Sequence, residues 1–173
     1  MVIKIKYKNE KLNFTSKKEY IKENILIEYG ELAAQTASSP ISISDSSIFM
    51  DLESKMCLKI FDIWEVDKYN LDGEIILNEK IFINKEKFIY KMLIGKILRL
   101  IPGGVTIISI GINASLARRF TQALGYAISE LCSLYVNLAT NESNVNHLEI
   151  FTKDAIEDLM ESYLIEYNKT VLN

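Results

Sequence analysis

Three acidic residues beside a serine-rich loop are the first group that could do chemistry. Asp45, Asp51 and Glu53 follow the stretch Ser38–Ser44, and carboxylates near hydroxyl groups can hold a metal ion or transfer protons. The same residues also have a simpler explanation. Asp45 is well placed to cap the next helix, and Asp51 and Glu53 are expected at exposed positions of that helix. We therefore expect no catalytic site here.

A Pro-Gly-Gly turn is the second candidate. Pro102, Gly103 and Gly104 could present a nest of backbone amides at a helix N-terminus, which suits an anion. A tight turn with proline at the first helical position is the competing explanation. No nucleotide-binding loop is indicated, because Gly95-Lys96-Ile97 lacks the hydroxyl residue that such a loop needs. Binding of an anion or small ligand at this turn remains an alternative function.

Two adjacent arginines, Arg118 and Arg119, interrupt a long apolar segment. Their stems could extend along the rim of the core, or their guanidinium groups could contact lipid phosphate or an acidic partner. The single histidine, His147, lies in a polar stretch that is typical of a surface loop, so no serine has a base at hand. No Cys/His cluster accompanies it, and we expect neither zinc nor any other cofactor. The sequence therefore predicts a protein that is not an enzyme.

The composition is that of an ordinary globular chain. With 173 residues and 49% hydrophobic content, the chain falls in the size range of a single domain, 1–173. A net charge of -3 provides no basic field, so nucleic acid is not an expected partner. Cys57 and Cys132 have apolar neighbours and should be free, buried thiols. The N-terminus alternates lysine with apolar residues and is no signal peptide, which predicts a cytoplasmic protein.

The two ends of the chain differ in charge. Residues 1–24 contain seven lysines and three glutamates, whereas residues 142–173 contain seven acids and two lysines. Solvated faces that attract each other are one explanation of this asymmetry. The other is a basic N-terminal surface for an anionic membrane or an acidic partner.

We predict a mainly α fold, a helical bundle around a buried apolar helical hairpin, with one or two short β-hairpins at about residues 2–15 and 75–83. The first hairpin is predicted from strict alternation of apolar and lysine residues. The motif Ser16-Lys17-Lys18-Glu19 has the form of a capping box, which predicts a helix from Ser16 to about Thr36. The expected organisation is an N-terminal hairpin 1–15, a helical core 16–140 and a C-terminal helix 150–171.

Two further helices have clear signals. Residues 46–64 form an amphipathic pattern whose apolar face is formed by Ile48, Leu52, Met56, Ile60 and Ile63. The polar residues 67–73 after it predict a loop or turn. The last helix should begin at Thr152, with Phe151 and Ile156 spaced as a hydrophobic staple and Asp154 in its first turn.

The longest apolar segment runs from residue 100 to residue 141 and contains only three charged residues. An uninterrupted helix of this length would be about 60 Å long, so we expect a break near Gly111-Ile112-Asn113. The eighteen uncharged residues 100–117 are of borderline length for a membrane span. Their small and polar members favour a buried core helix instead, and a hairpin 100–138 that inserts into lipid is the alternative.

Part of this segment resembles a known family. The motifs Ile101-Pro102-Gly103, Ile112-Asn113-Ala114 and Thr121–Tyr126 are similar to the characteristic segment of the YcjF-like, GTPase-associated domain of unknown function. Upstream, Pro40–Asp45 looks like that family's Pro-Ile-Pro-x-x-Asp loop, and Met56 matches a methionine of the next helix; together the matches cover about residues 30–135.

The chain also departs from the family pattern. Ser42 and Ile43 stand where a second proline is expected, Glu53 replaces a common glutamine, and residues 67–84 look like an extra hairpin. The resemblance implies a bacterial accessory module that accompanies a GTPase and does not itself hydrolyse GTP. Since neither a GTPase domain nor a membrane span is expected here, the chain would be a stand-alone relative.

The leading interpretation is thus a non-catalytic interaction domain. It would bind a protein partner, such as a GTPase or a second copy of itself as an oligomer, in the cytoplasm or at the membrane surface. The candidate contact residues are Pro102, Gly103, Gly104, Arg118, Arg119 and Asp45.

Overall fold

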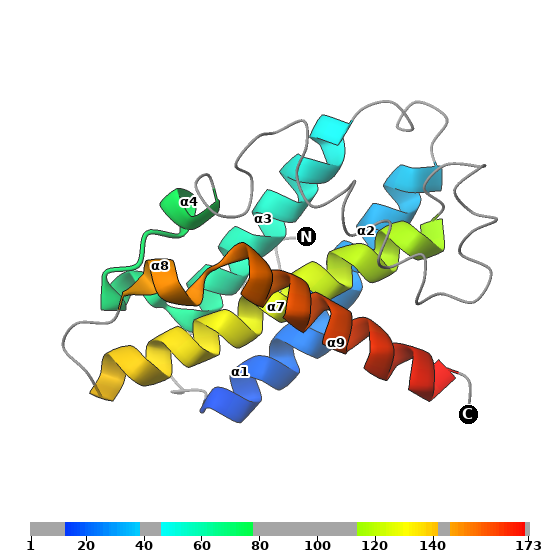
Figure 1. Ribbon diagram of the computed structural model, residues 1–173. Helices are drawn as coiled ribbons and strands as arrows, with labels where there is room; N and C mark the ends of the chain where they lie inside the picture. The colour runs from blue at the N-terminus through cyan, green and yellow to red at the C-terminus, as the bar shows by residue number, and fades with distance from the viewer. Residues whose placement is uncertain (1–12, 39–45, 78–113, 142–145, 172–173) are drawn as a thin grey trace.

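The computed structural model describes residues 13–38, 46–77, 114–141 and 146–171, and these residues are almost entirely helical, without a β-strand among them (Figure 1). The mainly α class is therefore confirmed. The helices are α1 (Phe14–Tyr20), η1 (Ile21–Ile25), α2 (Leu26–Ser38), α3 (Ser46–Trp64), η2 (Val66–Tyr69), α4 (Gly73–Ile76), α7 (Ala114–Asn141), α8 (His147–Ile150) and α9 (Lys153–Val171).

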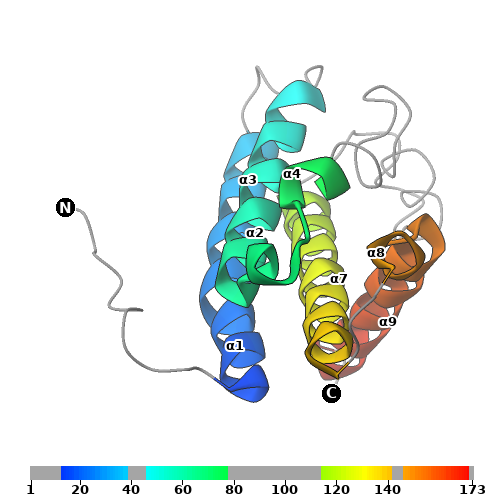
Figure 2. The ribbon, with the colours of Figure 1, turned by 90° about the vertical axis from the view of Figure 1, so that its left-hand side faces the viewer.

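Helix α7 is the central element of the bundle. It packs against α2, α3 and α9, and Figure 2 shows α2 and α3 on one side of it and α8 and α9 on the other. Because neighbours flank it on both sides, α7 buries apolar residues around most of its circumference, from Leu116 to Val136. The described part of the long apolar segment, residues 114–141, is therefore the core of the bundle, as its composition predicts.

Two glycines let these helices approach closely. A Cβ atom added to Gly125 of α7 would lie 2.4 Å from Leu26 Cδ2 and 2.9 Å from Met56 Sδ, and one added to Gly30 of α2 would lie 2.8 Å from Gln122 Nε2. A side chain at either position would force the facing side chains to move, so the two glycines allow the closest approach of these helices. The α2–α7 seam is built on these glycines.

Two of the predicted helices are confirmed. Helix α3 has the predicted bounds, Ser46–Trp64. Thr152 caps α9, since its Oγ1 accepts a hydrogen bond from the Ala155 amide at 3.2 Å. Phe151 and Ile156, the staple pair, are both fully buried, and Asp154 lies in the first turn.

The β-hairpins are not seen. Of the first hairpin, residues 14 and 15 belong to α1, and of the second, residues 75 and 76 belong to α4; residues 1–12 and 78–83 lie outside the described residues. The first helix begins within two residues of its expected start near Ser16, but its predicted cap is wrong. Asn13, not Ser16, is the cap, because its Oδ1 accepts a hydrogen bond from the Ser16 amide at 2.8 Å. Both residue types favour the cap position, and because the helix begins directly after Asn13, Ser16 already lies in its first turn.

The predicted apolar face of α3 is only partly correct. Met56 and Ile60 are fully buried, but Ile48 is 41% exposed. The buried face instead extends to Phe49, Glu53 and Cys57, as α3 packs against both α2 and α7. A helix that touches two neighbours buries a wider stripe than one facing a single partner.

Candidate functional site

Four of the six predicted contact residues, Asp45, Pro102, Gly103 and Gly104, lie outside the described residues, as does the expected break at 111–113. Arg118 and Arg119 lie near the start of α7. Arg118 Nη2 donates to Glu31 Oε2 of α2 at 2.8 Å, and the Arg119 guanidinium lies 5.0 Å from the centre of the Tyr167 ring of α9. Both arginines thus connect α7 to its neighbours.

The two acidic candidates on α3, Asp51 and Glu53, lie in different environments. Asp51 is exposed, as predicted, and forms an ion pair with Lys55 at 2.6 Å. Glu53 was expected at an exposed position, and this is wrong because its side chain is only 2% exposed. Its Oε1 accepts a hydrogen bond from Thr121 Oγ1 of α7, at the long distance of 3.4 Å. Glu53 faces α7, so the two acids share no site.

Burial controls the protonation of Glu53. Desolvation raises the pKa of its carboxyl group from 4.5 to about 8, and the hydrogen bond from Thr121 opposes this rise only in part. Glu53 is therefore mostly neutral at pH 7. One turn along α3, the Cys57 thiol is also fully buried, and burial raises its pKa as well. Cys57 and Cys132 are both free and buried, which confirms their expected character as small apolar residues.

A groove opens on the surface where α3, η2 and α4 meet. We call it the α3–α4 groove; its volume is about 470 Å³, within the range typical of binding pockets. Its lining residues are Leu58, Phe61, Asp62, Val66, Asp67, Asn70, Leu71, Asp72, Gly73 and Glu74.

Local backbone geometry shapes this groove. Glu65 and Asn70, on either side of η2, have left-handed φ angles of 55° and 60°, which turn the chain after α3 and again before α4. Val66 follows the first turn and Leu71 follows the second. Both side chains insert into the core and are 3% and 1% exposed, respectively. A hydrogen bond from α7 also stabilises η2, because the Tyr135 hydroxyl donates to the Tyr69 carbonyl at 2.6 Å.

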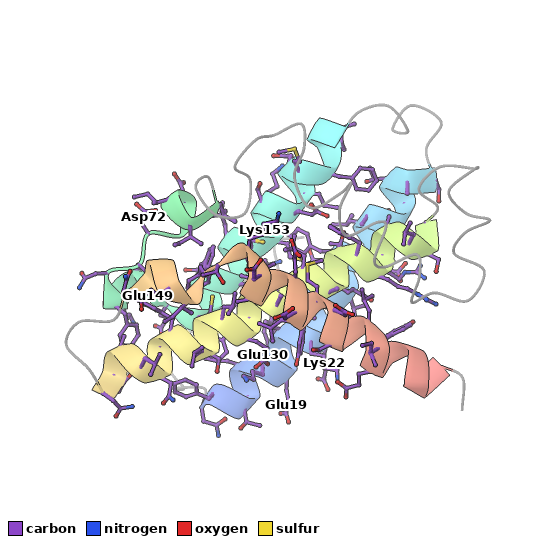
Figure 3. All side chains as sticks on the ribbon, viewed as in Figure 1. Glu19, Lys22, Asp72, Glu130, Glu149 and Lys153 are labelled. Atoms are coloured by element: carbon purple, nitrogen blue, oxygen red, sulfur yellow. The ribbon has the colours of Figure 1, made fainter. Side chains whose placement is uncertain are left out.

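The far wall of the groove is α4. Asp72 caps this short helix, accepting hydrogen bonds from the amides of Glu74 and Ile75 at 2.9 and 3.2 Å. Gly73 follows, and a Cβ atom there would lie 2.7 Å from Phe61 Cδ2, so the α4 backbone rests on the Phe61 ring. Figure 3 shows Asp72 at the edge of the molecule, beside α4.

The groove combines an apolar floor with an acidic edge. Phe61, Val66 and Leu71 are buried beneath it, and four carboxylates line it: Asp62, Asp67, Asp72 and Glu74. Among the described residues that line it there is no lysine, arginine or histidine. No group of three or more metal-ligating side chains is found anywhere in the described part of the chain. The exposed part of the described lining is therefore acidic, with Leu58 as its exposed apolar side chain.

Sequence reasoning missed this groove. A signal was present, since residues 62–74 contain five acids and one lysine. However, the sequence predicts only the end of a helix at residues 62–64 and a polar turn at residues 67–73, because no periodic pattern shows that Val66 and Leu71 point inward. Regarding the membrane alternative, none of the helices in the described ranges is long and apolar enough to cross a bilayer.

Comparison with known proteins identifies no relative. No protein-family model matches the chain, and neither a curated protein nor a solved structure is significantly similar to it.

Proposed function

We propose that this chain is a non-catalytic interaction domain that binds a protein partner through the α3–α4 groove. The groove itself supports this proposal best, because an exposed apolar side chain beside charged groups resembles the apolar centre and polar rim of a protein interface. Leu58 at its edge is 37% exposed and offers an apolar contact to a partner.

The other candidate groups of the described chain have structural roles that fit this proposal. Glu53 is sealed between helices, Arg118 pairs with Glu31, and Arg119 lies over Tyr167. A catalytic acid or base must reach its substrate, and Glu53 is only 2% exposed. Packing between the helices therefore explains these side chains better than catalysis does.

The first partners to test are a GTPase and a second copy of this chain. Both follow from the resemblance of the 100–127 segment to the GTPase-associated family, and in this proposal the domain acts in the cytoplasm or at the membrane surface. The chain would regulate or position its partner and would not hydrolyse nucleotide.

The test uses two leucines on the surface. Leu58 at the groove and Leu134 on α7 are 37% and 47% exposed, so Leu58→Glu and Leu134→Glu introduce the same change at similar exposure. A partner retained by the immobilised full chain is purified and its binding is measured with each variant, while light scattering reports self-association. We expect Leu58→Glu to weaken binding at least about tenfold and Leu134→Glu to leave it unchanged. A partner that binds both variants equally well contradicts the proposal.

A further inference from the structure

We infer that Glu53 is a pH-sensitive switch: its neutral carboxyl keeps the N-terminal half of α3 packed on α7, and loss of its proton releases that half. The N-terminal half is residues 46–55, and the C-terminal half is residues 56–64. This inference depends neither on the α3–α4 groove nor on a partner. It follows from the position of Glu53, the packing of the two halves and the groups around the carboxyl.

Glu53 lies where α3 contacts α7 and is almost completely shielded from water. Its side chain is 2% exposed, and its Oε1 accepts a hydrogen bond from Thr121 Oγ1 at 3.4 Å. A normal hydrogen bond between two oxygen atoms is shorter, at about 2.7–2.8 Å. A neutral carboxyl tolerates such a site, whereas a carboxylate needs water or several short hydrogen bonds. Ionised Glu53 therefore gains free energy by moving into solvent.

The two halves of α3 differ in their packing. The C-terminal half contributes five buried side chains to the main core: Met56, Cys57, Ile60, Phe61 and Trp64. In the described N-terminal half, Phe49 is the one buried apolar side chain, and it packs with Ala33 and Ala117 in a separate small cluster. Glu53 lies between the two clusters, and Figure 1 shows the N-terminal end of α3 at the top edge of the bundle. The N-terminal half can therefore separate while the C-terminal half stays packed.

The surrounding groups do not compensate a carboxylate at this position. The charged residues on α2, α3 and α7 near it are paired with each other: Lys55 with Asp51, Lys59 with Glu28, and Arg118 with Glu31. The nearby titratable groups are the thiols of Cys57 and Cys132 and the Tyr29 hydroxyl, and burial raises the pKa of all three, which keeps them neutral. Burial also raises the pKa of Glu53, and the Thr121 hydrogen bond opposes this rise only in part.

The pH range of the switch follows from these contacts. The pKa of the Glu53 carboxyl is about 8 in the packed helix and returns toward its ordinary value of 4.5 when the N-terminal half is released. The equilibrium constant for release therefore increases as the pH rises toward 8 and levels off above it. From pH 6 to pH 9 the increase is ~100-fold at most. Release also exposes Cys57, which directly follows this half on the same face as Glu53.

The experiment measures the alkylation of Cys57 by iodoacetamide in the folded full chain at pH 6, 7, 8 and 9. Mass spectrometry assigns the modified cysteine. Iodoacetamide reacts with the thiolate, so variants are compared with each other at the same pH. We expect the ratio of the wild-type rate to the Glu53→Gln rate to rise ~10-fold to ~100-fold from pH 6 to pH 9. The control Asp51→Asn removes an exposed carboxylate two residues away and should keep the wild-type rates within about twofold.

Hydrogen exchange of the wild type locates the release and requires no variant to fold. After division by the intrinsic exchange rate at each pH, exchange should rise from pH 6 to pH 9 in residues 46–55 and stay slow in α7. A constant ratio of the wild-type and Glu53→Gln alkylation rates overturns the inference. So do equal increases of exchange in residues 46–55 and in α7, because they show that the whole fold opens.

Discussion

Glu53→Gln should make the protein more stable above neutral pH. In the fold, burial raises the pKa of the Glu53 carboxyl from 4.5 to about 8, which means that the fold favours the neutral form. The neutral Glu53 carboxyl contributes its full share to the free energy of unfolding below pH 4.5. This contribution is lost as the pH rises through about 8. Glutamine has nearly the same shape as glutamate, stays neutral at every pH, and can still accept the hydrogen bond from Thr121.

The magnitude follows from the pKa change. Each unit of pKa corresponds to ~1.4 kcal/mol, so moving a carboxyl from 4.5 to about 8 makes its ionised form cost about 5 kcal/mol in the fold. Relative to Glu53→Gln, the wild type should lose free energy of unfolding steadily between pH 5 and pH 8. Structural relaxation around the charge would reduce this loss, so it is an upper value.

Urea denaturation at pH 5, 6, 7 and 8 measures the effect. The single tryptophan, Trp64, is 1% exposed, and its fluorescence should report unfolding. The control is Glu23→Gln, which removes an exposed carboxylate and should follow the wild-type pH profile. If Glu53→Gln and the wild type lose stability in parallel from pH 5 to pH 8, the burial argument is refuted.

Three further changes test the packing and capping of the helices by thermal or urea denaturation. Gly125→Ala should destabilise the fold by about 1–3 kcal/mol, because its new methyl group would lie 2.4 Å from Leu26 Cδ2; an unchanged melting temperature would show that the α2–α7 seam is looser than described. Ser129→Ala should cost about 1–3 kcal/mol, since it removes the acceptor 3.1 Å from the buried Trp64 Nε1; a neutral effect would mean that another acceptor takes its place. Asn13→Ala should cost about 1 kcal/mol and Ser16→Ala less, whereas the reverse order would support Ser16 as the cap of α1.

The sequence predicted helices well where the signals act between residues that are close in the chain. The bounds of α3 follow from a 3.6-residue apolar period, and the start of α9 follows from Thr152 and the pair Phe151 and Ile156. The predicted first cap failed for an equally local reason, because Asn13 and Ser16 are both residues that favour the cap position and the helix begins after Asn13.

The sequence by itself determined that the chain is mainly helical, that the segment containing α7 is its core, and that Cys57 and Cys132 are buried free thiols. Only the tertiary structure decided that Glu53 is enclosed between helices while Asp51, two residues away, is exposed. It also decided that two left-handed residues, Glu65 and Asn70, shape an acidic groove. The physical reason is the distance along the chain over which each effect acts. Periodicity and capping act between residues a few positions apart, whereas the burial of a side chain depends on which helices, distant in sequence, pack against its own helix.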